Sequence, residues 1–479
     1  MQTPSYPDLK LLIDGQWRQG SGDSADVVLN PATNAVLGEL RHAGIDDLED
    51  AVAAAGRGFA VWREMAPVDR SAILRRAAAL MRERSQAIAS PLTMEQGKVL
   101  AEARLEVEAA AASIEWMAEE GRRAYGRLVP GRPGVQQIVQ PEPVGIVAAF
   151  CPWNFPVLIP ARKISAALAA GCSVIIKPSE ETPGAAMEMA KCFEDAGLPK
   201  GALNMVFGVP SRISEYLIRA EAVRKISFTG SVEVGRQIAG LAAEGIKRVT
   251  MELGGHAPVI VCADANIEKS ISLLAAFKHR NAGQVCISPT RFYVHDSVCD
   301  SFVRQYRQAV EAIQVGNGLD PANAMGPLAN KRRIAAIERL VDDVRQRGGT
   351  LLTGGRRIGN SGNFFEPTIV TEIDDTARIM TEEPFGPITP IARFSTLEEV
   401  VERANSLPLG LAAYAFTEGL KTAREIGERV ESGMIGINTV AISTPETPFG
   451  GVKASGYGQE CGIEGLDAYL HRKFVAYAQ

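Results

Sequence analysis

The feature that most constrains this chain is an alternation of short apolar runs with longer helical runs, which begins at Val144. Apolar runs of about five residues followed by helical runs of about twelve are typical of βαβ units, which build a parallel sheet covered by helices. The predicted strands are residues 144–150, 173–177, 203–207, 225–228 and 248–251. The predicted helices between them are residues 157–170, 184–196, 211–220 and 232–243.

A second alternating series begins at residues 257–261 and runs to about residue 437. We therefore expect an α/β chain with two doubly wound parallel-sheet domains. Three segments upstream of the first series have the amphipathic pattern of long helices: residues 46–65, 67–96 and 99–123. Residues 132–139 are predicted to be extended. Residues 467–479 alternate apolar and polar side chains, which predicts a terminal strand. Such a strand often pairs with another segment or with another subunit.

Charge and cysteine usage exclude several classes of function. The net charge of −5 over 479 residues gives no electrostatic reason to expect nucleic acid or an anionic membrane as a partner. The first eight residues lack the basic and apolar regions of a secretion signal, so we expect a cytoplasmic protein. Seven cysteines without a Cys-x-x-Cys pair and five dispersed histidines predict neither a disulfide framework nor a metal site.

Two short motifs carry residues suited to covalent catalysis. Cys286 ends the turn Gly283-Gln284-Val285-Cys286, and Glu252 ends a strand-like run just before Gly254 and Gly255. A thiol can attack a carbonyl carbon while a carboxylate handles the protons and later activates water. A lone cysteine is more often a small buried apolar residue, so the pair is convincing only together with further motifs.

Further motifs follow the predicted strands in a fixed order. Pro152-Trp153-Asn154-Phe155-Pro156 is a proline-restrained loop at a strand end, where ligands bind in open α/β sheets. Lys177-Pro178-Ser179-Glu180 follows the next strand, and Phe228-Thr229-Gly230-Ser231 joins a later strand to a helix. Glu382-Glu383-Pro384-Phe385-Gly386-Pro387 and Pro448-Phe449-Gly450-Gly451 lie further on. Each motif alone also fits an ordinary turn or surface loop.

Taken together, these motifs resemble the aldehyde dehydrogenase superfamily over nearly the whole chain. The resemblance implies a Cys286 nucleophile, Glu252 as the base that activates water, and Asn154 with the Cys286 N–H as the oxyanion site. It implies NAD as the cofactor, held by Trp153, Lys177, Ser179, Glu180, Gly208, Gly230, Ser231, Glu383 and Phe385. A carboxylate at position 180 would repel a 2′-phosphate, which favours NAD over NADP.

The resemblance also divides the chain into domains. Residues 1–124 and 144–252 correspond to an NAD-binding domain, and residues 253–436 to a catalytic domain that carries the thiol. Residues 125–143 and 437–479 correspond to bridging and oligomerisation segments, which implies a homodimer or homotetramer.

Three residues point to the substrate. Arg162, Arg280 and Ser443 match the positions at which succinate-semialdehyde dehydrogenases hold the far carboxylate of their substrate. The sequence around Cys286 resembles α-ketoglutarate-semialdehyde dehydrogenases still more closely. Ser288 stands where some relatives carry a second cysteine, so a disulfide switch is not expected.

Two other functions are also compatible with the sequence. Glu446, near the proposed carboxylate site, would oppose an anionic substrate if it pointed inward, which favours a broad-specificity enzyme for aliphatic or aromatic aldehydes. A non-catalytic protein on the same scaffold is the other alternative, and the intact Cys286, Glu252 and Asn154 argue against it.

Overall fold

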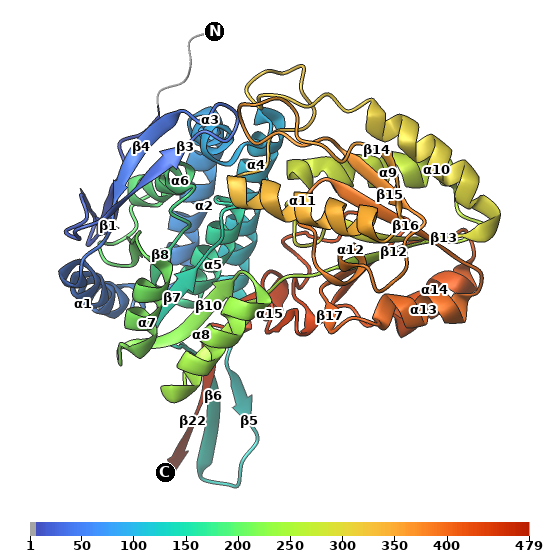
Figure 1. Ribbon diagram of the computed structural model, residues 1–479. Coiled ribbons are helices and arrows are strands. Elements are labelled where there is room, and N and C mark those ends of the chain that lie inside the picture. The colour runs from blue at the N-terminus through green and yellow to red at the C-terminus, as the bar shows by residue number, and fades with distance from the viewer. Residues whose placement is uncertain (1–5, 479) are drawn as a thin grey trace.

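The computed structural model describes residues 6–478, which form two α/β halves side by side and a protruding small sheet (Figure 1). The predictions for the N-terminal segment and the terminal strand include residues 1–5 and 479, which lie outside the described residues. The prediction of two doubly wound parallel sheets with a small β element is confirmed.

The first half is built on an eight-stranded sheet in the order β2-β1-β9-β8-β7-β10-β11-β21. Strands β7 to β11 are parallel and fully or largely buried, which explains their continuous apolar character in the sequence. Antiparallel strands that the sequence analysis did not predict complete both edges. The strands are β1 (Leu11–Ile13), β2 (Gln16–Arg18), β7 (Ile146–Phe150), β8 (Ser173–Lys177), β9 (Leu203–Met205), β10 (Val223–Thr229), β11 (Arg248–Glu252) and β21 (Gly456–Tyr457).

Helices cover this sheet on both sides. They are α1 (Ile45–Trp62), α2 (Pro67–Glu83), α3 (Ser85–Gln96), α4 (Leu100–Glu120), α5 (Leu158–Ala170), α6 (Pro183–Asp195), α7 (Pro210–Arg219) and α8 (Val232–Glu244). The prediction of one helix over residues 67–96 is wrong, because Arg84 leaves the helical conformation at φ −101° and ψ 18°. The break lets α3 pack against both α4 and α6.

The second half is built on a seven-stranded sheet in the order β14-β15-β16-β13-β12-β18-β19. All neighbouring pairs are parallel except β14 with β15. The strands are β12 (Ala257–Val261), β13 (Pro289–His295), β14 (Thr350–Thr353), β15 (Thr368–Thr371), β16 (Ile388–Phe394), β18 (Ala412–Phe416) and β19 (Met434–Ile437). The helices are α9 (Ile267–His279), α10 (Asp296–Glu311), α11 (Lys331–Gln346), α12 (Arg378–Thr381), α13 (Leu397–Asn405) and α14 (Leu420–Arg429).

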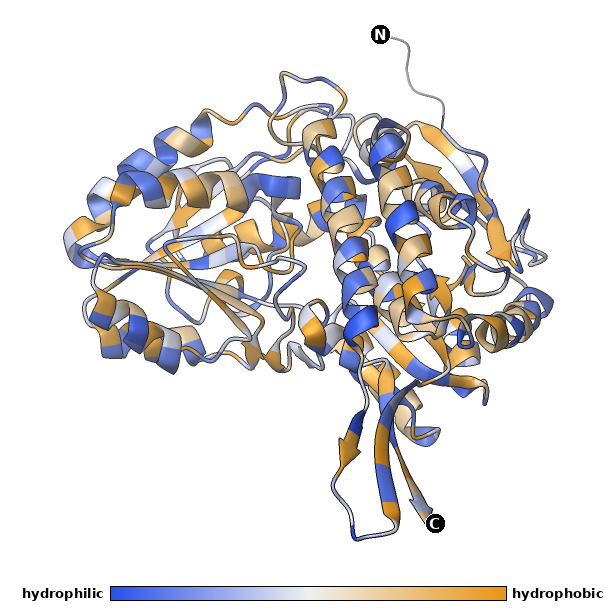
Figure 2. Cartoon of the chain, turned by 180° about the vertical axis from the view of Figure 1, so that it is seen from behind, coloured by the Kyte–Doolittle hydropathy of each residue, from blue (hydrophilic) through white to orange (hydrophobic). Residues whose placement is uncertain are grey.

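Three smaller β elements complete the chain. Strands β5 (Arg127–Val129), β6 (Val135–Pro143) and β22 (Leu470–Ala478) form the protruding sheet, along which apolar and polar residues alternate (Figure 2). The other two elements are two-stranded sheets. One is formed by β3 (Ala25–Leu29) and β4 (Val36–Arg41), and the other by β17 (Leu409–Gly410) and β20 (Val452–Lys453). The predicted terminal strand begins later than expected, because the helix α15 (Gly462–Asp467) precedes β22. Within residues 6–478, every helix is too short or too polar to cross a bilayer.

The carboxyl ends of β7, β8, β10 and β11 carry the predicted motifs. β10 pairs with both β7 and β11, so the loop after Phe150, Thr229 and Glu252 lie at one edge of the sheet. On the far side of Glu252, β21 pairs antiparallel with β11, with Gly456 opposite Glu252. The C-terminal segment therefore completes the sheet beside the predicted base.

Candidate active site

The loop that carries Cys286 has an unusual backbone. Asn281, Ala282 and Gly283 adopt left-handed conformations at φ 50°, 52° and 73°. Such conformations are unfavourable for residues with a Cβ, so the surrounding structure must hold them. A Cβ on Gly283 would lie 2.2 Å from the Gly386 carbonyl oxygen, so the loop requires glycine there. Cys286 is partly buried, whereas the other six cysteines are buried.

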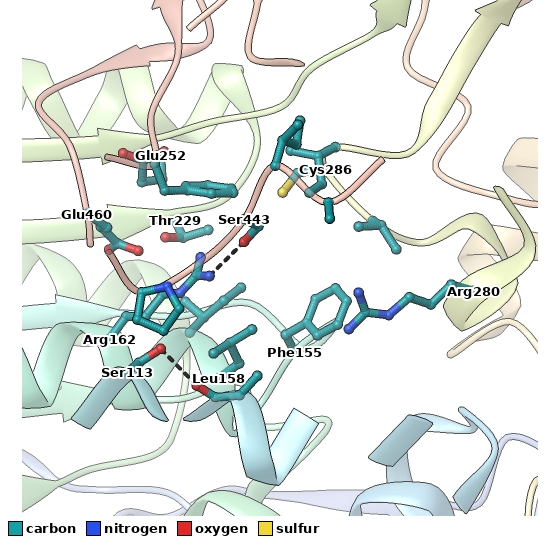
Figure 3. Close-up of a pocket in the computed structure, with 18 of the residues that line it drawn as sticks. Ser113, Phe155, Leu158, Arg162, Thr229, Glu252, Arg280, Cys286, Ser443 and Glu460 are labelled. Atoms are coloured by element: carbon teal, nitrogen blue, oxygen red, sulfur yellow. Dashed lines mark hydrogen bonds between the residues drawn. The ribbon is translucent and has the colours of Figure 1, made fainter. Parts of the chain in front are cut away.

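Cys286 faces a cavity of about 360 Å³ between the two halves of the chain (Figure 3). The structure brings five predicted site residues to its wall: Arg162, Glu252, Arg280, Cys286 and Ser443. The other polar lining groups are Ser113, Thr229 and Glu460. The remaining wall is mainly apolar, with the side chains of Phe155, Leu158, Ile159, Phe277, Val440, Ile442 and Phe449.

The Cys286 thiol is neutral in this environment. Burial raises its pKa to about 12, and the charges of Glu383 and Glu252 act in the same direction. Arg162 and the Ile287 N–H oppose the increase. The thiol therefore needs a proton acceptor or a change in its surroundings before it can attack as a thiolate.

Glu252 is well suited to hold a proton. Its side chain is buried, and neither carboxylate oxygen has a hydrogen-bond partner within residues 6–478. Burial raises its pKa well above the ordinary range, and the negative charge of Glu460 raises it further. Glu460 is itself bound to Lys163, whose Nζ donates to Glu460 Oε1 at 2.6 Å and to Ser227 Oγ at 3.0 Å.

Asn154 lies behind the cavity wall. Its Nδ2 donates to the Gln284 carbonyl at 3.2 Å, which joins its loop to the loop of Cys286. Its Oδ1 is buried and has no partner among the described residues. The structure thus places Asn154 beside the thiol loop, and its role at an oxyanion stays a prediction.

The predicted substrate residues lie on different walls of the cavity. Arg162 Nη2 donates to Ser443 Oγ at 2.8 Å, and its guanidinium lies 4.8 Å from the centre of the Phe449 ring. Arg280 approaches from the other side, 5.2 Å from the centre of the Phe155 ring (Figure 3). Arg162 Nε is buried without a partner within residues 6–478. Glu446 is exposed and does not line the cavity, which removes the objection to an anionic substrate.

A second cavity, of about 660 Å³, is a groove at the carboxyl ends of β7, β8 and β10. The predicted cofactor residues that line it are Trp153, Lys177, Ser179, Glu180, Gly230 and Ser231. Lys177 Nζ donates to Glu180 Oε2 at 2.6 Å. Ser231 Oγ caps α8, whose N-terminus faces the groove and favours a phosphate. Thr229 lines both the groove and the thiol cavity, so the two spaces adjoin there.

Three predicted cofactor residues, Phe385, Glu383 and Gly208, do not line the groove. The Phe385 ring packs edge-on against Trp153 with the ring centres 5.5 Å apart. Glu383 accepts a hydrogen bond from the Gly255 N–H at 3.3 Å, and burial raises its pKa to about 7. Gly208 is not in the wall of the groove; it packs beside His42 with φ 145°, and its role stays a prediction.

Two features of the site were not predicted from the sequence: Thr229 as a shared wall residue, and the pair of Lys163 and Glu460. Thr229 was visible inside the Phe228–Ser231 motif. Lys163 directly follows Arg162, but nothing in the sequence connects it to Glu460, which lies 297 residues away. The two residues of this buried ion pair come together only in the folded chain, so the sequence alone does not indicate the pair.

This fold, with a cavity that contains a thiol and adjoins a groove at the strand ends, is that of an oxidoreductase. The chain belongs to the aldehyde dehydrogenase family, which it matches over residues 17–475. Members of this family use NAD or NADP. The suspected resemblance is therefore confirmed.

Three similar proteins show how the chain relates to known enzymes. It is 45% identical to the 4-(hydroxymethyl)benzenesulfonate dehydrogenase TsaD1 of Comamonas testosteroni, covering 100% of both chains. It is 41% identical to the NADP-dependent succinate-semialdehyde dehydrogenase GabD of Escherichia coli K12, covering 97% of this chain and 96% of GabD. The crystal structure of a succinate-semialdehyde dehydrogenase from Burkholderia pseudomallei superposes with a TM-score of 0.97 at 41% identity and 100% coverage of both chains.

Proposed function

We propose that this protein oxidises an aldehyde with a distal anionic group to the carboxylic acid, with NAD as the preferred cofactor. The observation that carries the proposal is the Arg162–Ser443 pair in the same cavity as Cys286 and Glu252. The partly unpartnered guanidinium of Arg162, buried in a mainly apolar wall, favours an anion over a neutral group at that point. Succinate and α-ketoglutarate semialdehydes have the required chemistry.

The reaction follows from the residues around the cavity. Cys286 Sγ, once deprotonated, attacks the carbonyl carbon, and Asn154 Nδ2 with the Cys286 N–H stabilises the resulting oxyanion. A bound NAD supplies the acceptor for the hydride that leaves the carbon. The carbon then remains attached to Cys286 as a thioester. Glu252 takes a proton from water, the water oxygen bonds to the carbon, and the acid leaves as the thiol is restored.

The alternative is a broad-specificity enzyme for aliphatic or aromatic aldehydes without an anion site. The apolar walls formed by Phe155, Phe277 and Phe449 favour an aromatic substrate body. TsaD1 is named for an aromatic sulfonate, and GabD for a short aliphatic semialdehyde. Both named compounds carry an anion, so the two comparisons support the anionic class and leave the body of the substrate to be measured.

We expect Arg162→Met to separate anionic from neutral substrates. The change keeps an apolar stem against Phe449 and removes the charge. For succinate semialdehyde and 4-formylbenzoate, kcat/KM should fall about 30- to 100-fold, the size of one or two lost hydrogen bonds to a charged group. For benzaldehyde, the loss in kcat/KM should be at least about tenfold smaller, because no anion is bound and only the effect of the Arg162 charge on Cys286 and Glu252 remains. NADH formation at 340 nm measures both.

Two companion variants sharpen this test. Ser443→Ala should produce a smaller loss with the same selectivity, and Arg280→Met shows whether the second arginine contributes. Equal losses with anionic and neutral aldehydes, or no loss with either, would contradict the anion site and leave the broad-specificity alternative.

The preference for NAD rests on Glu180. Its carboxylate lies in the groove, ion-paired to Lys177 at 2.6 Å, where a 2′-phosphate would add a second negative charge. We expect Glu180→Gln to shift the ratio of kcat/KM values toward NADP by about tenfold, which corresponds to the removal of about 1.4 kcal/mol of repulsion between like charges. The matched control is Glu188→Gln, which breaks the same i,i+3 pairing with Lys191 at 2.6 Å outside the groove. An unchanged ratio in Glu180→Gln would contradict the assignment.

We further propose that the enzyme is a cytoplasmic homodimer or homotetramer, assembled through the β5–β6–β22 sheet. That sheet extends away from the rest of the chain, and Leu128, Phe474 and Tyr477 on it are exposed (Figure 1). Exposed apolar side chains on a sheet with a free edge are typical of a subunit contact.

A further inference from the structure

A buried ion pair lies next to the active site without being part of it. Lys98 lies between α3 and α4, and Glu106 lies in the second turn of α4. Their side chains are 1% and 0% exposed, and the Lys98 Nζ and Glu106 Oε2 atoms are 2.5 Å apart. Neither side chain lines the thiol cavity or the cofactor groove. Buried ion pairs add little net stability compared with apolar residues, so a pair in this place calls for another explanation.

Both partners bind the loop that carries Asn154. Lys98 Nζ donates to the Asn154 carbonyl oxygen at 2.8 Å and lies 4.0 Å from the centre of the Phe155 ring. Glu106 Oε1 accepts the N–H groups of Val157 and Leu158 at 2.9 and 3.1 Å, where α5 begins. The pair therefore fixes the backbone on both sides of Phe155.

The same part of the chain also holds the thiol loop. Gln96 Nε2 donates to Asn281 Oδ1 at 2.8 Å, and Glu102 Oε2 accepts the Asn281 N–H at 2.9 Å. Asn281 Nδ2 in turn donates to the Asn154 carbonyl oxygen at 3.0 Å and to the Gln284 carbonyl oxygen at 3.2 Å. The Asn154 carbonyl thus receives one hydrogen bond from Lys98 and one from the loop of Cys286.

We propose that Lys98 and Glu106 are positioning residues for the oxyanion site. They hold the Asn154 backbone at a fixed distance from the thiol loop, and with it the Nδ2 hydrogen that is not donated to the Gln284 carbonyl and would bind the oxyanion. Preorganised donors are effective because no reorganisation accompanies the reaction, and small displacements forfeit much of the effect. The inference rests on the role of Asn154 given under the proposed function.

The test is a double-mutant cycle that combines the ion pair with Asn154. Lys98→Met with Glu106→Gln removes both charges together, so no unpaired charge stays buried, and the Gln oxygen can still accept from Val157 and Leu158. We expect kcat to fall about 10- to 100-fold, as for a displacement of the order of 1 Å at a reacting group. In an Asn154→Ala background the same change should lower kcat by less than about threefold, because the affected donor is already gone.

Three measurements separate positioning from a general loss of structure. Hydrolysis of 4-nitrophenyl acetate passes through an oxyanion and should fall in parallel with kcat. Alkylation of Cys286 by iodoacetamide forms no oxyanion and should stay within about twofold, as should the Kd for NAD. The matched control is Lys225→Met, which removes an equally buried lysine that donates to Thr250 at 2.7 Å, touches neither the Asn154 loop nor the thiol loop by a hydrogen bond, and lines neither the cavity nor the groove.

The outcomes are distinct. If Asn154→Ala itself leaves kcat unchanged, the oxyanion assignment of the proposed function fails. If Asn154→Ala lowers kcat but the ion-pair change lowers it equally in both backgrounds, the positioning role is overturned while the proposed function stands. Should the double variant not fold, Lys98→Arg keeps the ion pair but displaces the Asn154 carbonyl. It should show the same dependence on Asn154, and an additive loss overturns the inference.

Discussion

Replacing Cys286 by serine is expected to lower kcat for aldehyde oxidation by at least about 10⁴-fold, the loss typical of removing a nucleophile. An alcohol is a far weaker nucleophile than a thiolate and ionises much less readily. Burial already raises the pKa of the Cys286 thiol to about 12, so the site has little capacity to activate a still weaker acid. Steady-state NADH formation and single-turnover kinetics should both be lost.

The control for this variant is Cys299→Ser. Cys299 is a buried cysteine on α10 in the same half of the chain, outside the thiol cavity. Its replacement should leave kcat within about twofold, because it contacts no reacting atom. Retained single-turnover activity in Cys286→Ser would contradict a covalent mechanism through this thiol. An unchanged Kd for NAD would show that the loss concerns chemistry and not cofactor binding.

The second large effect is expected for Glu252→Gln. The amide has nearly the same shape but cannot take a proton from water, so the thioester should accumulate and steady-state kcat should fall about 10²- to 10⁴-fold. A rapid burst of NADH, close to one equivalent per site, should precede the slow phase. Mass spectrometry of the quenched enzyme should then find the acyl group on Cys286.

Two observations test this interpretation of Glu252. Hydroxylamine attacks a thioester without a general base, so it should restore turnover in Glu252→Gln. Because burial and Glu460 raise the Glu252 pKa, the base form grows as pH rises, and kcat of the unmodified enzyme should keep increasing at pH values where an ordinary carboxyl group is already ionised. The slow phase of Glu252→Gln should lack that increase. A variant without a burst would assign Glu252 to the thiol step instead.

The regular parts of the fold could be predicted from the sequence because they follow from local patterns. Continuous apolar runs and helical runs gave all five central strands of the first sheet within a few residues. Strands of three residues such as β1 and β2 are too short to show an alternation of apolar and polar residues. β21 has only two residues, and it is a strand because Gly456 and Tyr457 pair with β11 in the folded chain. The break at Arg84 is likewise decided by how α3 packs on its neighbours.

The candidate site could be predicted in part for the same reason. Cys286, Glu252 and Ser443 lie at strand ends or in loops, Arg162 lies in the helix that follows the Asn154 loop, and the structure brings all four to one cavity. Their contacts could not be predicted, because they join residues far apart in the chain. The Arg162–Ser443 bond and the Lys163–Glu460 pair span 281 and 297 residues. The opposite placement of Arg162 and Arg280 is also a property of the folded chain.

The pairing of β21 with β11 has a consequence for how the enzyme is made. Glu252 is translated well before Gly456 and Tyr457, the residues that complete the sheet beside its strand. A nascent chain on the ribosome can build most of the first sheet long before those residues emerge. The Glu252 carboxylate therefore reaches its final surroundings only after Gly456 and Tyr457 have been made, some two hundred residues later.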